Sequence, residues 1–409
     1  MGLDAAISGR PAPQLRDLAR GTNQIGVRLY NERLVLSLIR RLGRASKAEI
    51  ARLTGLSAQT ISVIVKQLEA DALLLKETPV RGRVGQPSVP FRLNPRGALS
   101  LGLKIGRRSA DLVLMDFVGR VLGARRETYP FPEPGPLFGF VERSAPALTR
   151  PLAAAEAARI AGLGIALPFE LWSWHEEVGA PGPALGAWRG IDVQAEVAGR
   201  CPWSVLVCND ATAACGAELV FGQGDRFRDY LYLFIGSFVG GGLVLDRHLF
   251  PGRTGNAAAL GSTLVPGGPQ GVQQLIDCAS LFVLERRCLA AGLDPTSLWR
   301  SPDEWSEPPD LIDAWIDEAA GALAVAIVSA VAVVDVEAVV IDGAFPAWVR
   351  ARFVERIATA LAEVDQRGLG EFELVEGTIG SRARAIGGAT LPLLANFAQD
   401  REVLFTEAE

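Results

Sequence analysis

The chain has 409 residues, 49% of them hydrophobic and 21% charged, with a net charge of −5, which is the balance of a globular protein of two or three domains. This composition excludes disordered, collagen-like and disulfide-rich proteins, and the longest apolar runs fall short of a membrane span, so no membrane partner is expected. Two histidines, five scattered cysteines and no CxxC pair predict no metal site and a cytoplasmic location.

The charge is divided unevenly along the chain. Residues 28–92 hold twelve Lys and Arg against five acidic residues and carry +7, residues 1–27 add +1, and the remaining 317 residues carry −13. A basic module on an acidic body indicates an anionic partner for the module alone, although a solvated basic face would have the same charge.

The basic module, residues 28–93, has the pattern of a winged helix-turn-helix domain behind a flexible N-terminus, residues 1–27. Apolar residues at helical spacing predict a first helix that ends at a glycine. Ser46, with a glutamate three positions later, predicts a capping box for a short second helix. A turn containing Gly55 then leads to a third helix, which Ser57 is expected to cap.

The third helix is predicted to read DNA. Its apolar stripe runs from Ile61 to Leu68, so the opposite face presents small polar side chains and a lysine, which suit a major groove. Strands at about Leu73–Glu77 and Val89–Leu93 enclose a wing rich in arginine and glycine, which suits a minor groove. The predicted DNA-binding residues are Ser57, Gln59, Thr60, Ser62, Lys66, Arg81, Arg83 and Gln86. Use of the module for a protein contact is the alternative.

Residues 94–409 are predicted to form a body of two α/β lobes. Strand-like segments alternate with helical ones, as in mixed sheets that are covered on both faces. The first lobe is expected at about residues 94–205 together with a last helix, Ala385 to Phe397, and the second lobe at about residues 206–384. The very apolar segment Leu323 to Val334 is predicted to be a helix buried between layers.

Several motifs, in their order along the chain, resemble those of the ROK family of repressors and sugar kinases. They are the helix-turn-helix pattern directly followed by Leu101-Gly-Leu-Lys-Ile-Gly106, then Cys208-Asn-Asp-Ala211, Ile235-Gly-Ser-Phe-Val-Gly-Gly-Gly242, Gly252-Arg-Thr-Gly-Asn-Ala-Ala-Ala-Leu-Gly261 and Ile341-Asp-Gly343. The resemblance implies an α/β, actin/hexokinase-like (ribonuclease H-like) body of two lobes with a sugar in the cleft. It also implies a homodimer or homotetramer that places its recognition helices on a palindromic operator.

The residues that a sugar kinase of this family needs for catalysis are replaced. Lys104 stands at the aspartate that orders the metal and the phosphates, and a lysine cannot hold magnesium. Phe238 stands at a glycine of the phosphate loop, where it hinders close approach of the backbone. Ala259 and Ser262 stand at the glutamate and histidine of the motif that binds sugar and zinc. We therefore expect no catalytic residue, no metal and no cofactor.

The aspartate that acts as general base in the family's kinases is retained, as Asp210, beside Asn209. In a regulator this carboxylate can accept a hydrogen bond from a sugar hydroxyl; the alternative is that Asp210 only caps the helix that starts at Ala211. Asn256, in a glycine-rich turn, is either a third ligand contact or a plain turn residue. The predicted ligand-binding residues are Asn209, Asp210 and Asn256.

The sequence thus predicts a sequence-specific DNA-binding transcriptional regulator, a repressor, whose degenerate sugar-kinase-like domain senses a sugar or sugar derivative. One alternative is an active ATP-dependent hexose kinase that carries a DNA-binding domain. Another is a regulator that responds to a protein partner. The identity of the effector and of the operator does not follow from the sequence.

Overall fold

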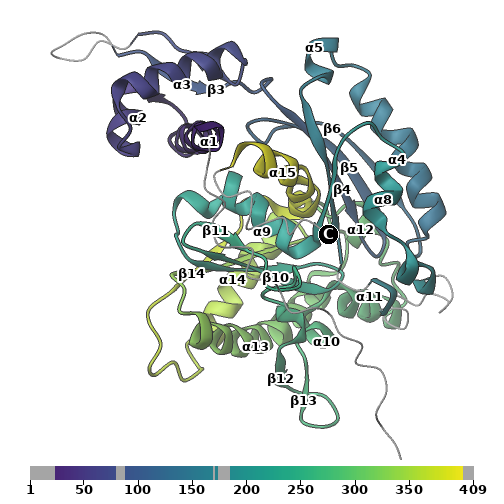
Figure 1. The fold of residues 1–409 in the computed structure, drawn as a ribbon. Helices are drawn as coiled ribbons and strands as arrows, with labels where there is room; N and C mark the ends of the chain where they lie inside the picture. Colours follow the sequence, from purple (N-terminus) through teal and green to yellow (C-terminus); the bar gives the residue numbers. More distant parts are fainter. Residues whose placement is uncertain (1–23, 80–87, 169–170, 174–184, 399–409) are drawn as a thin grey trace, which may run out of the picture.

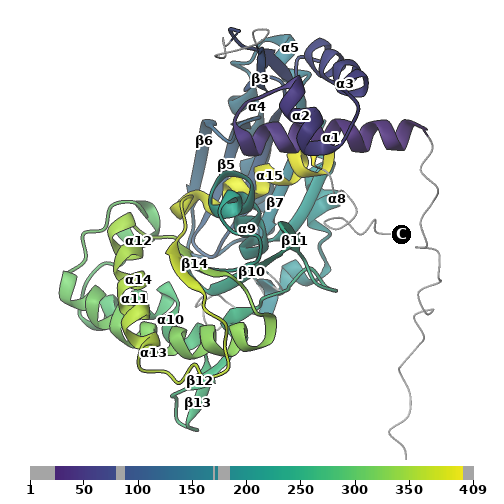
Figure 2. The ribbon, with the colours of Figure 1, turned by 90° about the vertical axis from the view of Figure 1, so that its left-hand side faces the viewer.

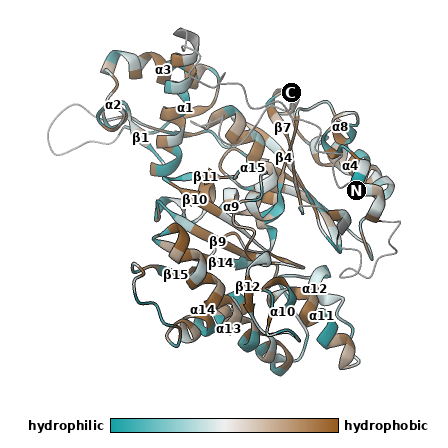
Figure 3. Cartoon of the chain, turned by 60° about the horizontal axis from the view of Figure 1, so that its bottom comes forward, coloured by the Kyte–Doolittle hydropathy of each residue, from teal (hydrophilic) through white to brown (hydrophobic). Residues whose placement is uncertain are grey.

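The computed structural model describes residues 24–79, 88–168, 171–173 and 185–398. These residues form a small head, residues 24–79 and 88–93, on a body of two α/β lobes (Figure 1). The predicted architecture, a winged helix-turn-helix followed by a two-lobe body, is confirmed. Figure 3 shows that hydrophobic residues follow the central strands of both sheets of the body.

The helices and caps of the head form as the sequence predicts. Its elements are α1 (Gln24–Leu42), β1 (Ala45–Ser46), α2 (Lys47–Thr54), α3 (Ala58–Ala70), β2 (Leu74–Lys76) and β3 (Pro90–Leu93), with β3 between β1 and β2 in the sheet. Ser46 and Glu49 form the capping box of α2, and Gly55 ends α2 with a φ of 72°. Helix α1 begins at Gln24, so residues 24–27 continue the first helix of the head.

The first lobe contains a mixed sheet in the order β6-β5-β4-β7-β8. Its strands are β4 (Leu99–Ile105), β5 (Ser109–Asp116), β6 (Val121–Thr128), β7 (Ile160–Leu167) and β8 (Val205–Asn209). Strand β4 is antiparallel to β5 and parallel to β7, which is parallel to β8. One face is covered by α4 (Pro134–Thr149) and α8 (Val193–Ala198) (Figure 1). The short elements α5 (Ala154–Ala157), before β7, and η1 (Leu171–Ser173) and η2 (Ala187–Gly190), after it, also belong to this lobe.

The second lobe contains a mixed sheet in the order β11-β10-β9-β14-β15. Its strands are β9 (Tyr230–Ile235), β10 (Val239–Leu245), β11 (His248–Phe250), β14 (Ala338–Gly343) and β15 (Glu373–Glu376). The outer elements are α10 (Ile276–Ala279), α11 (Leu281–Ala290), α12 (Ser297–Arg300), α13 (Pro309–Val334), α14 (Ala347–Leu361) and the hairpin β12 (Leu264–Pro266) and β13 (Val272–Gln274). Short turns η3 (Gln223–Asp225), η4 (Leu260–Ser262) and η5 (Gly380–Arg382) complete the lobe.

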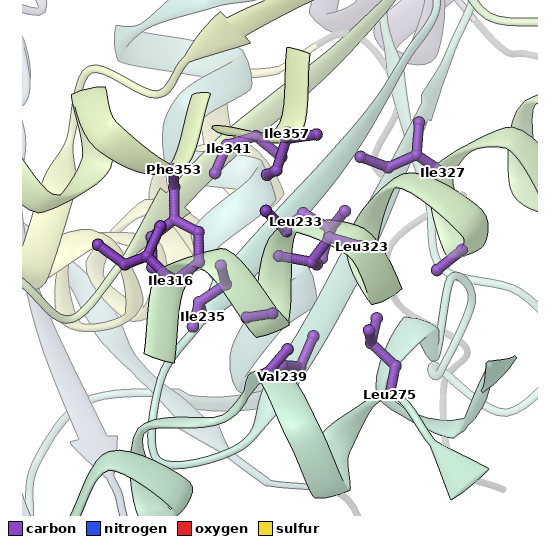
Figure 4. Close-up of a cluster of buried hydrophobic side chains, with 14 of the residues drawn as sticks. Leu233, Ile235, Val239, Leu275, Ile316, Leu323, Ile327, Ile341, Phe353 and Ile357 are labelled. Atoms are coloured by element: carbon purple, nitrogen blue, oxygen red, sulfur yellow. The ribbon is translucent and has the colours of Figure 1, made fainter. Parts of the chain in front are cut away.

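Helix α13 is longer than predicted and is a core helix. It is the one helix among the described residues whose length and composition match a membrane span, which corrects the expectation that the apolar runs are too short. Its Ile316, Leu323 and Ile327 are buried and pack with residues of β9 and α14 (Figure 4). At its N-terminal end Asp313 and Asp317 pair with arginines of α14.

Two helices, α9 (Asp210–Phe221) and α15 (Ala383–Phe397), lie between the two sheets: α15 contacts β4 and β7 of the first, α9 contacts β10 of the second, and the helices contact each other. Glycines let them approach closely: a Cβ at Gly102 of β4 would lie 2.2 Å from the carbonyl oxygen of Ala385 in α15. On the other side, a Cβ at Gly242 of β10 would lie 2.3 Å from the Cβ of Cys215 in α9. Part of the glycine run at residues 240–242 therefore serves helix packing.

Candidate functional site

Helix α3 presents a polar face to solvent. Gln59, Ser62 and Lys66 are exposed, on the side opposite the buried residues Ile61, Ile64, Val65 and Leu68. Nζ of Lys47, from α2, donates a hydrogen bond of 3.2 Å to Oγ of Ser62, so both helices contribute cations and donors to this face. Such a face can bond phosphates and base edges.

The other predicted DNA-binding residues lie outside this polar face, at the start of α3 or in the wing. Oγ of Ser57 accepts a hydrogen bond from the backbone nitrogen of Thr60 at 3.1 Å, and the two hydroxyl groups lie 2.8 Å apart. These two side chains therefore form the cap that starts α3. The wing residues Arg81, Arg83 and Gln86 lie outside the described residues.

A cavity of about 310 Å³ between the lobes brings together the three predicted ligand-binding residues. Asn209 and Asp210 come from the junction of β8 and α9, and Asn256 from the turn before η4. The four residues that the sequence analysis placed at altered kinase positions divide over two cavities: Phe238, Ala259 and Ser262 line this one, and Lys104 lines its neighbour. A concave site with several convergent polar groups is typical of small-molecule binding.

Asn209, and not Asp210, caps α9. The Oδ1 atom of Asn209 accepts hydrogen bonds from the backbone nitrogens of Ala211 and Thr212 at 3.0 and 3.1 Å. The helix begins at Asp210, so the interpretation of Asp210 as a cap is wrong. The carboxylate of Asp210 accepts a hydrogen bond of 3.1 Å from Nη1 of Arg384, and both side chains are largely buried.

The sequence analysis missed Arg384. The predicted last helix began at Ala385, whereas α15 begins at Ala383, which places Arg384 in its first turn and in the cleft. The guanidinium of Arg384 lies 4.9 Å from the ring centre of Phe234. Its Nε atom is buried and has no hydrogen-bond partner among the described residues. Arg384 is thus held in the cleft, and its Nε–H group is a hydrogen-bond donor without an acceptor among the described residues.

A second cavity, of about 390 Å³, continues the cleft on the other side of Arg384. Lys104 of β4 lines it and is buried, with its Nζ donating to the carbonyl oxygen and Oγ of Ser109 at 3.0 and 2.7 Å. The same Nζ lies 3.2 Å from the carboxylate of Asp111. Burial lowers the pKa of Lys104 to about 8. The amine is fully engaged by residues of its own lobe.

An ion-pair cluster joins the lobes next to these cavities. Arg107 and Arg108, in the turn between β4 and β5, both pair with the carboxylate of Glu285 in α11 of the second lobe. The side chains of Arg107 and Glu285 are each 6% exposed, and the Arg108 guanidinium lies 5.1 Å from the ring centre of Trp299. We call Arg107, Arg108 and Glu285 the interlobe clasp. Because Glu285 comes from the second lobe and the arginines from the first, the clasp links the two lobes.

No group of three or more metal-ligating side chains occurs within the part of the chain that the structure describes. In the turn that carries Asn256, Ala258 has a φ of 55°, a left-handed conformation that glycine adopts more readily. The following residue, Ala259, is exposed to the cavity and offers no polar atom on its side chain. The polar groups that line this cavity are amides, hydroxyls, Asp210, Arg384 and Arg107, which is paired with Glu285.

Two known families match parts of this chain. Residues 101–297 match the ROK family, and residues 28–71 match the winged helix-turn-helix DNA-binding family. The uncharacterized protein y4fQ of Sinorhizobium fredii is 28% identical over 377 residues, which cover 90% of this chain and 91% of that protein. The xylose repressor of Bacillus subtilis is 22% identical over 279 residues, which cover 65% of this chain and 69% of that protein.

Solved structures share the fold. The crystal structure of a ROK family transcriptional regulator, a homolog of the E. coli MLC protein, has a TM-score of 0.65 at 20% identity and covers 91% of this chain and 97% of that one. A ROK family glucokinase from Streptomyces griseus, in complex with glucose and AMPPNP, has a TM-score of 0.56 at 19% identity and covers 72% of this chain and 99% of that one. The glucokinase likeness covers less of this chain than that of the regulator.

Proposed function

Because the chain carries a ROK family domain behind a winged helix-turn-helix DNA-binding domain, we propose that it is a sequence-specific DNA-binding transcriptional regulator. The exposed polar face of α3 carries this proposal. A helix of this kind enters the major groove, where Gln59 can bond base edges and Lys66 can reach phosphates. The net charge of +7 on residues 28–92 supports an anionic partner, and the −13 of residues 93–409 keeps the body away from that partner.

We propose further that the body binds a sugar or sugar derivative as its effector and that the protein acts as a repressor. Asn209, Asp210 and Asn256 in one cavity support this proposal, since amides and a carboxylate are suited to hydroxyl groups. The names of two similar proteins, a xylose repressor and a glucokinase in complex with glucose, agree with it. Effector binding favours one arrangement of the lobes and thereby lowers operator affinity. A homodimer or homotetramer on a palindromic operator, in the cytoplasm, completes the proposal.

We propose that the body is not a sugar kinase. Lys104 is fully engaged within its own lobe and cannot hold magnesium. Arg107 and Arg108 both pair with the one carboxylate of Glu285, so the clasp competes with a nucleotide phosphate for them. Ala259 lacks the carboxylate that binds the sugar in kinases that the chain resembles.

DNA selection with the full-length protein tests the function. Fragments that bind are selected from a random pool, and binding is then measured by fluorescence anisotropy at several salt concentrations. Gln59→Ala is expected to change the preferred bases, because it removes a base-edge contact. Lys66→Ala is expected to weaken binding to all fragments and to reduce the slope of log K against log salt by about 0.9.

The control is Arg287→Ala, in α11 of the body, which is expected to leave DNA binding unchanged. ATP-dependent phosphorylation of a sugar panel is measured on the same preparation. Robust phosphorylation together with no DNA binding would show that the protein is a sugar kinase and not a transcriptional regulator. Unchanged affinity and base preference in both α3 variants would show that this helix does not read DNA.

A further inference from the structure

The ion pair of Asp210 and Arg384 lies at one end of two helices that reach the head at their other end. Asp210 is the first residue of α9, and Arg384 is the second residue of α15. Helix α15 is about 20 Å long from Arg384 to Phe397 at 1.5 Å per residue. Figures 1 and 2 both show α15 beneath α1 of the head. A change in the cleft therefore has a short and direct route to the DNA-binding domain.

The far ends of both helices lie around Arg40 of α1: Phe221 of α9 contacts it directly, and Phe397 of α15 contacts it through the ring of Phe117. Its Nη1 donates a hydrogen bond of 2.7 Å to the carbonyl oxygen of Phe117. Its guanidinium lies 4.7 Å from the ring centre of Phe117 and 5.7 Å from that of Phe221, the last residue of α9. Phe397, the last residue of α15, packs edge-on against Phe117 at 4.9 Å. The ends of α9 and α15 thus meet at one contact point with α1.

Between these ends the two helices are packed too tightly to move past each other. A Cβ at Gly387 of α15 would lie 2.1 Å from the carbonyl oxygen of Ala213 in α9. Toward the first sheet, a Cβ at Gly164 of β7 would lie 1.9 Å from the carbonyl oxygen of Gly388. Close-packed elements of this kind shift as units between discrete arrangements.

Arg384 has the chemistry of a ligand contact. One terminal nitrogen is held by Asp210, while its Nε is buried with no hydrogen-bond partner in the described ranges. Asp210 accepts hydrogen bonds and Arg384 donates them, so neighbouring hydroxyl groups of one ligand can donate to the first and accept from the second. The pair thus offers an acceptor and a donor side by side in the cleft.

We propose that Arg384 binds the effector together with Asp210 and that α15 transmits the change to the head. This proposal rests on the proposed function, which supplies the operator and the class of effector. The ligand-free ion pair holds α15 in the arrangement that binds DNA. A polyhydroxylated ligand replaces the pair, and α15 then repositions α1 through Phe397 and Arg40.

The test uses the full-length protein and a DNA fragment selected with it. Arg384→Met removes the charge but keeps an apolar stem over Phe234, and Arg384→Lys is the conservative variant. The control is Arg356→Met, an exposed arginine on α14 that lines neither cavity of the cleft. D-glucose and D-xylose serve as probes. Operator affinity is measured by anisotropy with and without each sugar, and sugar binding by the rise in Tm.

In the absence of sugar, Arg384→Met is expected to weaken operator binding at least fivefold, and Arg384→Lys to recover part of that loss. The rise in Tm that a sugar causes in the wild type is expected to disappear in Arg384→Met and to persist in Arg356→Met. If Arg384→Met does not fold, as judged by circular dichroism, the nearly isosteric Asp210→Asn is expected to give the same fivefold loss.

Both measurements, operator affinity and the rise in Tm with sugar, have an outcome that would contradict the proposal. Wild-type operator affinity in Arg384→Met or Asp210→Asn would overturn transmission through α15. A retained rise in Tm in Arg384→Met would overturn the ligand contact. A wild type that binds no DNA fragment would refute the proposed function itself, and this inference with it. A wild type stabilised by neither sugar would contradict the effector class and the contact with Arg384, while the operator arm would still decide on α15.

Discussion

At the scale of single residues, Lys104 is a charged group that the fold buries at a cost. Its amine is held by Ser109 and Asp111, yet burial still lowers its pKa to about 8, against about 10.4 for an exposed lysine. Below pH 8 the amine is protonated in both the folded and the unfolded chain. Between pH 8 and 10.4 the unfolded chain keeps a proton that the folded chain has released, so the free energy of unfolding rises with pH.

This pH dependence is measurable by comparison with Lys104→Met, because the titration of other groups cancels in the difference. The free energy of unfolding of the wild type is expected to gain about 1 kcal/mol relative to the variant between pH 7.5 and pH 9. Urea unfolding at three pH values within this range measures the gain. A difference that does not change with pH would show that Lys104 is not buried as a charged amine.

The candidate site shows what single residues reveal in a sequence. Asn209, Asp210 and Asn256 were predicted together because they stand in motifs whose order resembles one family, and one cavity does contain them. The alternative interpretation of Asp210, as a helix cap, named the wrong neighbour, since Asn and Asp are equally good at an N-cap and Asn209 takes this role. Arg384 was missed because it contacts a residue 174 positions away, and no local pattern encodes that contact.

At the scale of elements, the interlobe clasp ties α11 of one lobe to the β4–β5 turn of the other. Glu285 is buried with two arginine partners, so its replacement by glutamine leaves cations without a counter-charge. Glu285→Gln is therefore expected to lower the free energy of unfolding by about 3 kcal/mol. Urea unfolding checks the value.

The control for the clasp is Glu318→Gln. Glu318 is 65% exposed and pairs with Arg287 of α11, the helix that also carries Glu285. An exposed pair contributes less than about 1 kcal/mol, so a small effect is expected. Equal effects of the two substitutions would mean that the clasp is no stronger than a surface ion pair.

Elements were predictable from the sequence where their signals are local. The capping box of α2 and the apolar stripe of α3 depend on residues within one or two turns, and both are confirmed. Strand β6 was not predicted, because it is a largely exposed edge strand without alternating apolar residues. Helix α13 was predicted too short, since its first half mixes acidic residues with the apolar ones.

At the scale of the whole molecule, the head and the body share one hydrophobic core. Val35 and Leu38 of α1 belong to the same buried cluster as Phe117 after β5 and Leu393 of α15. The motif order predicts a head and a two-lobe body, but it does not predict this docking, which depends on side chains that are far apart in the sequence. A shared core makes the head sensitive to the state of the body, as the proposed loss of operator affinity on effector binding requires.

The shared core predicts that head and body unfold together. All eight tryptophans lie beyond residue 170, so tryptophan fluorescence reports on the body, while hydrogen exchange of the amides of α1 to α3 reports on the head. Both probes are expected to give one transition in the wild type. Leu393→Ala is expected to lower the free energy of unfolding by about 3 kcal/mol and to let the head open before the body. Leu289→Ala, at an exposed site on α11, is the control and is expected to leave both transitions together. Separate transitions in the wild type would mean that the head is an autonomous domain, and α15 would then have no packed contact through which to act on DNA binding.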